Sequence, residues 1–492
     1  MKMTLKFHNT LTGRVDEFIS QHENQALVYT CGPTAYDYMH IGNWMAYIYW
    51  DILIRILIAN DYEVTRVINI TDVGHLTSDA DEGQDKLEKG ARREGKTAWE
   101  IAKFYADDFK KGLQRLNMIQ PQFIAKATDY LPQQLDIVRK LQDKGYTYQI
   151  DDGIYFDTSK FPSYADFAHL NLNALQAGAR VEFNSQKRNP SDFALWKFTP
   201  AGEIRDMEWE TPVELLDSTI MLNLPVMGFP GWHLECSAMA MALLGQTLDI
   251  HTGGIDHIPV HHTNEIAQSE AITGVRFSNY WLHNNHLKVN GTKISKSLGN
   301  GYTLNDLENK GYSMQDFRMF ALQSNYKHEG NFTFDNLTAA KNRLQNWRDI
   351  AVIRHQIHDG LTDEDNKITD NKAVPSFATC QAIVETVSND LDTPNALSLI
   401  DEIFAKIAKS RLSNISRPAL TRLLETINDV LGIQLIETTP DISDEAKQMI
   451  IERRNAREEK NWAKSDTLRK ELAEMNISVR DNEHDTVWAY IQ

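Results

Sequence analysis

Cysteine is scarce in this sequence of 492 residues: it occurs only three times, at Cys31, Cys236 and Cys380. Three thiols that are far apart in sequence cannot form a disulfide framework, which excludes the disulfide-rich secreted domains and fits a reducing compartment. Each cysteine therefore needs an individual explanation. Cys380 lies outside every motif described below and is predicted to be a core residue.

The sequence also lacks a long uncharged apolar run. Its most apolar stretch, residues 44–59, is interrupted by Asp51 and Arg55, which a membrane-spanning helix would rarely tolerate. The first ten residues carry lysines but no continuous apolar stretch, so no secretory signal peptide is visible. We therefore expect a cytoplasmic protein with no membrane partner.

The sequence has fewer basic than acidic residues: 51 lysines and arginines and 68 aspartates and glutamates give a formal net charge of −17. Phosphate binding requires lysine and arginine, so this balance argues against a nucleic-acid partner, although binding needs only a local basic face. On charge alone, the basic stretch near the C-terminus is better explained as a solvated helix face with compensating glutamates. This stretch contains Arg453, Arg454, Arg457, Lys460, Lys464, Arg469 and Lys470.

The apolar segments indicate several domains, as expected for a chain too long for one ordinary core. Residues 26–30 are predicted to form a buried strand followed by a turn, a long helix begins at Ile41, and residues 64–70 form a second strand. This order is typical of a parallel nucleotide-binding sheet. Residues 248–251 and 280–283 are predicted to be further strands.

The remaining segments differ in character from this sheet. Hairpin-like pieces at residues 145–156 and several prolines indicate an inserted domain that splits the sheet. Residues 338–435 have a helical pattern, and a weakly helical, charged tail begins at Ile442. The sequence contains no internal repeat and no low-complexity tract.

The segment His40-Ile41-Gly42-Asn43 lies where the first loop enters the predicted helix. A helix N-terminus offers unpaired N–H groups and a positive dipole end, which suit a triphosphate. Gly42 would let a purine approach the backbone, and His40 would donate towards charge developing on the α-phosphate. Taken alone, a histidine beside a glycine at a helix start is more often a cap or a core residue.

A second motif is the loop of residues 293–297, KISKS, which lies between Gly291 and Gly299. Two lysines on a mobile loop can close over a polyphosphate and neutralise it as pyrophosphate leaves. By itself, this segment is explained equally well as an ordinary exposed loop. Together, the two motifs resemble the HIGH and KMSKS signatures of class I aminoacyl-tRNA synthetases, in the right order and separation.

A candidate metal site combines Cys31, Cys236, His261 and Glu265. His261 and Glu265 are four residues apart, which places both side chains on one face of a helix, and thiolate, imidazole and carboxylate groups are all zinc ligands. The sequence does not show that these four residues converge. For Cys236 alone, a buried thiol in the core is the more common explanation.

Longer strings resemble one family of class I synthetases, the cysteinyl-tRNA synthetases, over most of the chain. The tail resembles this family at residues 456–457, 460–463, 465–466 and Trp488. The strings are YTCGPT (29–34), NITD (69–72), DFALWK (192–197), GWHLECSAM (231–239), GGID (253–256) and HHTNEIAQ (261–268).

This resemblance implies a set of residue roles. One zinc ion would be held in the amino-acid pocket by Cys31, Cys236, His261 and Glu265. ATP would be bound by Pro33, Thr34, His40, Gly42, Asn43, Lys293, Ser295, Lys296 and Ser297. Cysteine would be bound by Gly32, Trp232 and Asp256, and tRNA by Arg457, Lys460, Trp462 and Asp466. The catalytic residues would be His40, Asn43, Lys293 and Lys296.

The chemistry of cysteine explains why a metal ion would be useful in that pocket. Cysteine and serine are near-isosteres, which shape alone discriminates by about a hundredfold. Zinc binds a thiolate and lowers the pKa of the thiol, so it recognises a group that serine does not have. A pocket of this kind needs no hydrolytic editing domain, and the inserted region is short for one.

Some positions depart from the family pattern. Asn43 replaces the second histidine of HIGH and can still donate to phosphate, and Ile294 replaces the methionine of KMSKS. Met45 stands where the family often has an arginine, so a phosphate contact there is in doubt. The segment before Gly231 is longer than usual, which predicts a differently built pocket entrance. Trp232 has a second explanation, as a core aromatic.

The expected fold is α/β, with a Rossmann-type parallel sheet, an inserted domain, an α-helical bundle and a small C-terminal domain. Residues 1–126 and 231–285 would form the two halves of the catalytic domain, and residues 127–230 the inserted domain. The other predicted parts are the connector (286–337), the tRNA-binding helical bundle (338–435) and the anticodon-contacting domain (436–492).

The expected activity is a cysteine–tRNA ligase reaction on L-cysteine, Mg-ATP and tRNA(Cys), by a monomer. Two alternatives remain open: a cysteine:amino-sugar ligase, which would lack the tail, and a non-catalytic tRNA-binding paralogue, which would not need the lysine loop and the metal residues.

Overall fold

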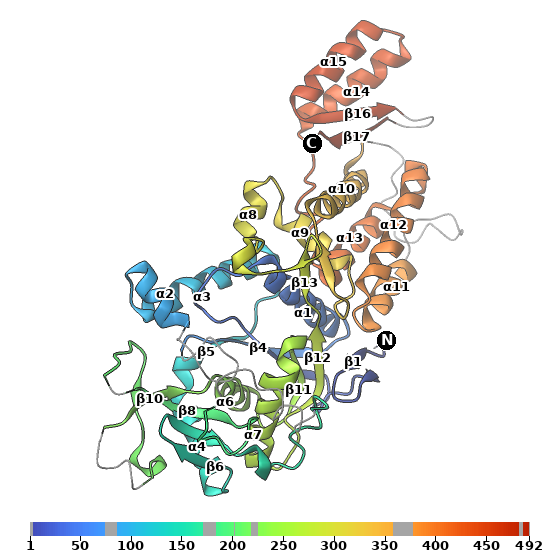
Figure 1. Cartoon of the computed structure of the whole chain (residues 1–492). Coiled ribbons are helices and arrows are strands. Elements are labelled where there is room, and N and C mark those ends of the chain that lie inside the picture. The colour runs from blue at the N-terminus through green and yellow to red at the C-terminus, as the bar shows by residue number, and fades with distance from the viewer. Residues whose placement is uncertain are drawn as a thin grey trace.

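The structure, a computed structural model, describes residues 3–73, 86–170, 184–200, 202–217, 225–357, 377–481 and 486–491. The molecule is elongated (Figure 1): a half built on β-sheets lies at one end, a group of helices follows, and two helices with a β-hairpin form the other end. The N-terminal hairpin consists of β1 (Lys6–Asn9) and β2 (Arg14–Glu17).

A five-stranded parallel sheet with the order β12-β11-β3-β4-β5 forms the centre of the first half. Chain order runs outward from β3 on one side and from β11 on the other, so it reverses between these two strands. Ligands of open parallel sheets bind beyond the carboxyl ends of the strands at such a reversal. The strands are β3 (Gln25–Thr30), β4 (Glu63–Ile70), β5 (Phe123–Lys126), β11 (Leu248–Gly254) and β12 (Ser278–Asn284).

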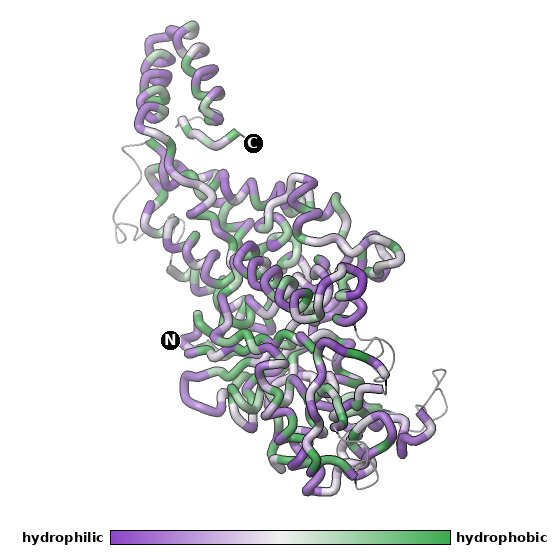
Figure 2. Tube along the Cα trace, turned by 90° about the vertical axis from the view of Figure 1, so that its left-hand side faces the viewer, coloured by the Kyte–Doolittle hydropathy of each residue, from purple (hydrophilic) through white to green (hydrophobic). Residues whose placement is uncertain are grey.

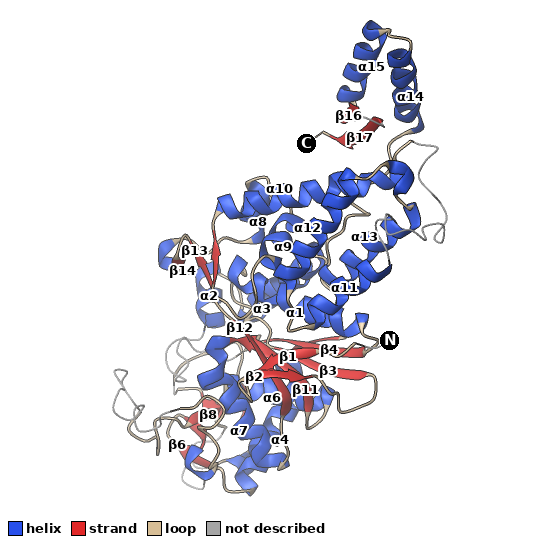
Figure 3. Cartoon of the chain, turned by 90° about the vertical axis from the view of Figure 1, so that its right-hand side faces the viewer, coloured by secondary structure: helices blue, strands red, loops and turns tan. Residues whose placement is uncertain are grey.

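Helices cover both faces of this sheet, as a buried parallel sheet requires. In Figure 3, α1 and α3 lie on one side of the sheet, and α4, α6 and α7 lie on the other. The helices of this half are α1 (Ile41–Ala59), α2 (Lys86–Glu94), α3 (Ala98–Arg115), α4 (Leu131–Asp143), α6 (Trp232–Leu244) and α7 (Thr263–Thr273).

Helix α1 is the one described helix that is long and apolar enough to cross a membrane, and 78% of its most apolar window is buried inside the protein. Its two charged residues explain how it fits there. Asp51 Oδ2 accepts from Arg55 Nε at 2.6 Å and also from Arg318 Nη2, and Asp51 Oδ1 accepts from the N–H of Ile119 at 2.7 Å. The charges are therefore paired within the core, and α1 packs as a core helix.

The segment between β5 and α6 forms a second sheet, which is antiparallel and has the order β6-β7-β8-β10-β9. Its apolar side chains, among them Phe156, Trp196 and Leu195, form a separate core with Val138 of α4. The hairpin predicted at residues 145–156 is confirmed. The strands are β6 (Thr147–Ile150), β7 (Gly153–Phe156), β8 (Phe193–Phe198), β9 (Trp209–Glu210) and β10 (Met227–Pro230).

After β12, a three-stranded sheet and two helices lead into the helical group. The strands are β13 (Leu287–Val289), β14 (Thr292–Lys293) and β15 (Gly330–Phe332). The helices are α8 (Leu304–Asn309), α9 (Met314–Leu322), α10 (Phe334–Ala351), α11 (Phe377–Ser388), α12 (Thr393–Lys409) and α13 (Arg417–Leu431).

The tail consists of α14 (Asp444–Glu458), α15 (Trp462–Glu474), β16 (Ile477–Asp481) and β17 (Thr486–Tyr490). It has a small core of its own, in which Ile450, Leu472 and Trp488 pack with Val352. Figure 2 shows that hydrophilic positions predominate on its two helices. The helices agree with the predicted charged tail, whereas the hairpin β16–β17 was not predicted.

Candidate active site

The loop after β3 is held close to β4 and β11, at the point where the strand order reverses. The N–H of Cys31 donates to Thr252 O at 3.1 Å, and the N–H of Gly32 donates to Asn69 Oδ1 at 2.6 Å. A Cβ atom at Gly32 would lie 1.5 Å from Asn69 O, so a side chain does not fit there. Tyr47 Oη also donates to Cys31 O at 3.1 Å. These contacts fix the position of Cys31 at the carboxyl edge of the sheet.

Two other elements bring the remaining candidate metal ligands to this edge. Cys236 lies in α6 and is buried, and Glu265 lies in the first turn of α7 and is also buried. His261 lies in a π-helical turn, Ile258–His262, that continues directly into α7. The predicted pairing of His261 and Glu265 on one helix face is therefore present, although the turn before α7 is not α-helical.

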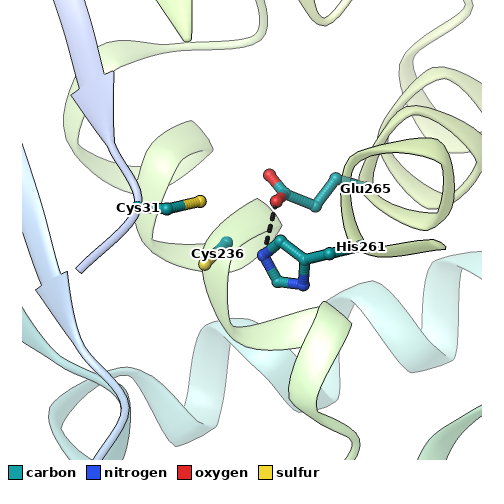
Figure 4. A group of neighbouring side chains, drawn as sticks. All are labelled: Cys31, Cys236, His261 and Glu265. Atoms are coloured by element: carbon teal, nitrogen blue, oxygen red, sulfur yellow. Dashed lines mark ion pairs between the residues drawn. The ribbon is translucent and has the colours of Figure 1, made fainter. Parts of the chain in front are cut away.

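The four candidate ligands converge, as Figure 4 shows. The ligand atoms of Cys31, Cys236, His261 and Glu265 all lie within 4.8 Å of one another, and His261 Nε2 is 2.7 Å from Glu265 Oε1. Tetrahedral zinc, with bonds of about 2.0–2.3 Å, would separate its ligand atoms by about 3.3–3.8 Å. The donor set, two sulfurs, one nitrogen and one oxygen, consists of zinc-binding groups throughout. The residues therefore fit a zinc ion.

Two histidines that were not predicted orient these ligands. His233 Nδ1 lies 3.0 Å from His261 Nδ1, which leaves Nε2 of His261 to face the cluster. His251 Nε2 lies 2.8 Å from Glu265 Oε2. Outer partners of this kind usually fix the orientation of metal ligands. Only the local richness in histidine, and no spacing rule, could have indicated them from the sequence.

A second set of donor atoms overlaps the first: those of Cys31, His251, His262 and Glu265 also lie within 4.8 Å of one another. His262 Nε2 is 3.3 Å from Cys31 Sγ, and its Nδ1 is 2.7 Å from Nε2 of His283. This set offers one thiolate where the first offers two, and thiolates favour zinc strongly. The first set is therefore the better zinc site.

The buried charges of the cluster depend on one another. Burial raises the pKa of Cys31 well above its usual value, and the free thiol of Cys31 donates a hydrogen bond to Cys236. Burial alone would also raise the pKa of Cys236, but the hydrogen bond from Cys31 and the nearby His261 lower it to about 6. Burial would lower the pKa of His261, yet Glu265 and Cys236 raise it to about 10. The cluster therefore favours a thiolate at Cys236, which is the form of cysteine that binds a metal ion.

The two side chains predicted to contact the cysteine substrate lie beside this cluster. The ring of Trp232 stacks on that of His261, with centroids 4.6 Å apart and planes at 20°. Asp256 is exposed, and its negative charge raises the pKa of Cys31. Trp232 is half-buried, so one part of it can face a ligand.

His40 and Asn43 form a reciprocal cap at the start of α1. The N–H of Asn43 donates to His40 Nδ1 at 3.2 Å, and the N–H of His40 donates to Asn43 Oδ1 at 3.2 Å. Because Nδ1 accepts, the proton of a neutral His40 is on Nε2. The expectation that the histidine is a cap is therefore confirmed, and its role towards ATP stays a prediction.

The structure brings the lysine loop to this cap. The N–H of Ile41 donates to Tyr302 O at 2.8 Å, and a Cβ atom at Gly42 would lie 3.0 Å from Ile294 Cδ1. Lys293 ends β14 and is exposed. Lys296 begins a 3₁₀ turn, Lys296–Leu298, but its side chain lies outside the described structure.

Other predicted ATP-site residues lie in the same two loops. Pro33 O accepts from the N–H of Thr71 at 3.0 Å, and Thr34 forms an isolated bridge with Thr71. Ser295 Oγ lies 3.2 Å from Ser297 Oγ.

The predicted tRNA contacts lie far from this site, at the end of α14, in the turn that follows it and at the start of α15. Trp462 is 54% exposed, and the Arg457 guanidinium lies 5.4 Å from the centre of its ring. Lys460 and Asp466 are exposed. Arg457 Nε also pairs with Asp481 Oδ2 at 3.3 Å, so this arginine contributes to the packing of the tail.

Comparisons with known families identify the family of this chain. The family model of the class I (C) tRNA synthetase catalytic domain matches residues 17–342, and that of the cysteinyl-tRNA ligase anticodon binding domain matches residues 439–488. The cysteine–tRNA ligase of Treponema denticola is 39% identical and aligns with 99% of each chain. The chain belongs to the cysteinyl-tRNA ligase family. It is therefore an enzyme of the class I aminoacyl-tRNA synthetases, a cysteine–tRNA ligase.

Further comparisons support the family and its fold. Cysteine–tRNA ligase 1 of Burkholderia lata is also 39% identical, over 97% of this chain and 95% of its own. The Mycobacterium tuberculosis methionyl-tRNA synthetase bound to methionyl-adenylate superposes with a TM-score of 0.57 at 15% identity, over 85% of this chain and 91% of its own. This likeness confirms the predicted class I architecture of the cysteinyl-tRNA ligase.

Proposed function

We propose that this cysteine–tRNA ligase selects its amino acid through one zinc ion held by Cys31, Cys236, His261 and Glu265. The observation that carries the proposal is the convergence of their ligand atoms within 4.8 Å at the carboxyl edge of the parallel sheet. The outer contact of His233 with His261 and the lowered pKa of Cys236 support the same assignment.

The pocket around these ligands has the parts that cysteine selection needs. A bound zinc ion would act as a Lewis acid that binds the thiolate of cysteine. A serine hydroxyl at neutral pH cannot provide a thiolate. Trp232 would cover the side of the pocket next to His261, and the exposed carboxylate of Asp256 would attract the ammonium group of the substrate. Gly32 would hold the loop against Asn69 and so place the backbone beside Cys31 next to the substrate.

In the first step, the carboxylate of cysteine would attack the α-phosphate of Mg-ATP, and pyrophosphate would leave. His40 would donate through Nε2 to the α-phosphate, because its Nδ1 accepts from the backbone of Asn43. The amide NH₂ of Asn43 would be the second donor, since its Oδ1 is used in the cap. Lys293 and Lys296 would neutralise the leaving phosphates.

The other proposed ATP contacts come from the same two loops: Pro33, Thr34, Gly42, Ser295 and Ser297. In the second step, the terminal 2′-OH of tRNA(Cys) would attack the acyl carbon of cysteinyl-adenylate and release AMP. The domain boundaries given above, a cytoplasmic location and a monomeric state belong to the same proposal.

The test is cysteine-dependent ATP–pyrophosphate exchange by purified, zinc-replete enzyme, followed by charging of tRNA. We expect exchange with cysteine and not with serine, and we expect a zinc chelator to abolish it and added zinc to restore it. Comparable exchange with serine would contradict selection through a thiolate-binding metal. Exchange without charging would favour the amino-sugar ligase alternative.

The tail offers a separate prediction for tRNA binding. Trp462→Ala should raise the KM for tRNA about tenfold, because stacking of one base on an aromatic ring stabilises binding by about 1–3 kcal/mol. Lys460→Ala should raise it less. Cysteine-dependent exchange should stay unchanged in both variants, and steady-state charging kinetics measure the difference.

The control for this prediction is Met475→Ala, which removes a 38% exposed apolar side chain at the other end of α15. Equal KM values in the Trp462 and Met475 variants would contradict the assigned role. Point variants are preferable to removal of the whole tail, because Gln356 Nε2 donates to Trp488 O at 2.8 Å in a buried contact.

A further inference from the structure

Two aromatic side chains are exposed side by side near the start of α1. Tyr38 is 43% exposed and Phe104 of α3 is 45% exposed. Their ring centroids are 6.0 Å apart, with planes at 78°, and Lys96 Nζ lies 5.3 Å from the centre of the Phe104 ring. We call these three residues the Tyr38 platform. Side chains of this size are usually buried, so their exposure suggests a binding surface.

The platform adjoins the proposed site of reaction. Tyr38 precedes His40 by two residues, which limits the separation of their Cα atoms to about 7 Å. Its ring also packs edge-on against Tyr105 of α3, at 5.2 Å. Helix α3 is in turn fixed to α1, because Phe109 stacks on Trp44 with centroids 5.6 Å apart. The platform is therefore held rigidly beside the turn that carries His40.

The segment that forms α2 and α3 has an excess of basic residues in an otherwise acidic protein, although Arg93 and Lys96 pair with Glu94 and Lys103 pairs with Asp107. Residues 86–115 contain nine lysines and arginines and five aspartates and glutamates, a balance of +4, whereas the whole chain carries −17. Figure 1 shows that α2 and α3, which contain these residues, lie together at one side of the sheet-bearing half. The exposed basic side chains are Lys89, Arg92, Arg93, Lys96, Lys103 and Lys111.

Exposed aromatic rings within a basic surface are the combination that binds single-stranded nucleic acid, since bases stack on the rings and phosphates pair with the cations. The substrate of this ligase carries such a strand, and its end must reach the acyl group beside His40. We propose that the Tyr38 platform binds the unpaired 3′ end of the tRNA by base stacking. The inference rests on the proposed role of His40 and extends it to the path of the substrate.

The test compares Phe104→Ala with Phe123→Ala in the full-length enzyme. Phe123 is also exposed, at 42%, but it lies at the amino end of β5. Phe104→Ala should raise the KM for tRNA about tenfold, as expected for the loss of one base stack. Cysteine-dependent exchange without tRNA should be the same as in the unmodified enzyme. Phe104→Tyr should keep the KM for tRNA of the unmodified enzyme, because its ring can still stack, whereas Phe104→Leu should raise this KM as the alanine variant does.

Binding of two tRNA transcripts separates the 3′ end from other contacts. Phe104→Ala should weaken binding of the complete transcript and leave binding of a transcript without its unpaired 3′ nucleotides unchanged. Equal KM values for the Phe104 and Phe123 variants, or equal weakening for both transcripts, would overturn the proposal. A parallel fall in exchange would also overturn it, because it would indicate a structural role. Failure of the unmodified enzyme to exchange with cysteine would instead refute the proposed function.

Discussion

Replacement of Cys236 by serine is expected to lower kcat/KM for cysteine-dependent exchange by more than about a hundredfold, because loss of even an outer partner of a metal ligand typically costs 10–100-fold. The substitution removes one of two thiolates from the proposed zinc site and leaves a hydroxyl, which binds zinc poorly at neutral pH. Zinc content, measured on the purified variant, should fall together with activity.

The protein contains a matched control in Cys380, which is also buried, at 7% exposure, but lies in α11 and outside the site. Cys380→Ser should retain zinc and full exchange. Loss of zinc should lower the melting temperature of the Cys236 variant somewhat relative to the Cys380 variant, but its loss of exchange should be far larger than its loss of stability. Equal losses of stability and activity in the Cys236 variant would favour a metal with a purely structural role.

Replacement of Asp51 by alanine is expected to produce the largest loss of stability. It should lower the free energy of unfolding by about 3–5 kcal/mol, the cost of removing one partner from a buried ion pair. Burial alone would raise the pKa of Asp51, but Arg318 and Arg55 hold this pKa below its usual value. Without Asp51, both arginines would be left in the core without their carboxylate.

The effect should extend beyond α1. Arg55 Nη1 also donates to Asn428 O in α13 at 2.8 Å, and Arg318 Nε donates to Leu431 O at 2.7 Å. The cluster thus joins the sheet-bearing half to the helical group. Urea denaturation, followed by intrinsic fluorescence, would measure the change.

A surface carboxylate provides the control for this second prediction. Asp136 of α4 is 47% exposed and pairs with Lys140 Nζ at 2.8 Å. Asp136→Ala should cost about 0.3–0.5 kcal/mol, the usual contribution of an exposed pair four residues apart on a helix. Equal destabilisation by the two alanine variants would show that the buried cluster has no special role.

The sequence determined the local elements and the identity of the reacting groups. The predicted strands at residues 26–30, 64–70, 248–251 and 280–283 match β3, β4, β11 and β12, because continuous apolar runs bounded by turn residues are typical of buried parallel strands. The turn at His40 and the pairing of His261 with Glu265 were equally local, since they depend on where a helix begins and on its periodicity. The family followed from long strings that match position by position.

Only the tertiary structure decided which distant residues meet. Cys31 and Cys236 are separated by the whole inserted region. They converge because the loop after β3 and the helix α6 meet at the carboxyl edge of the sheet, where the strand order reverses. The partners His233 and His251, the ionic cluster around Asp51 and the Tyr38 platform obey no spacing rule in the sequence. They arise from the packing of separate helices and strands, and such contacts between distant segments leave no periodic signal in the chain.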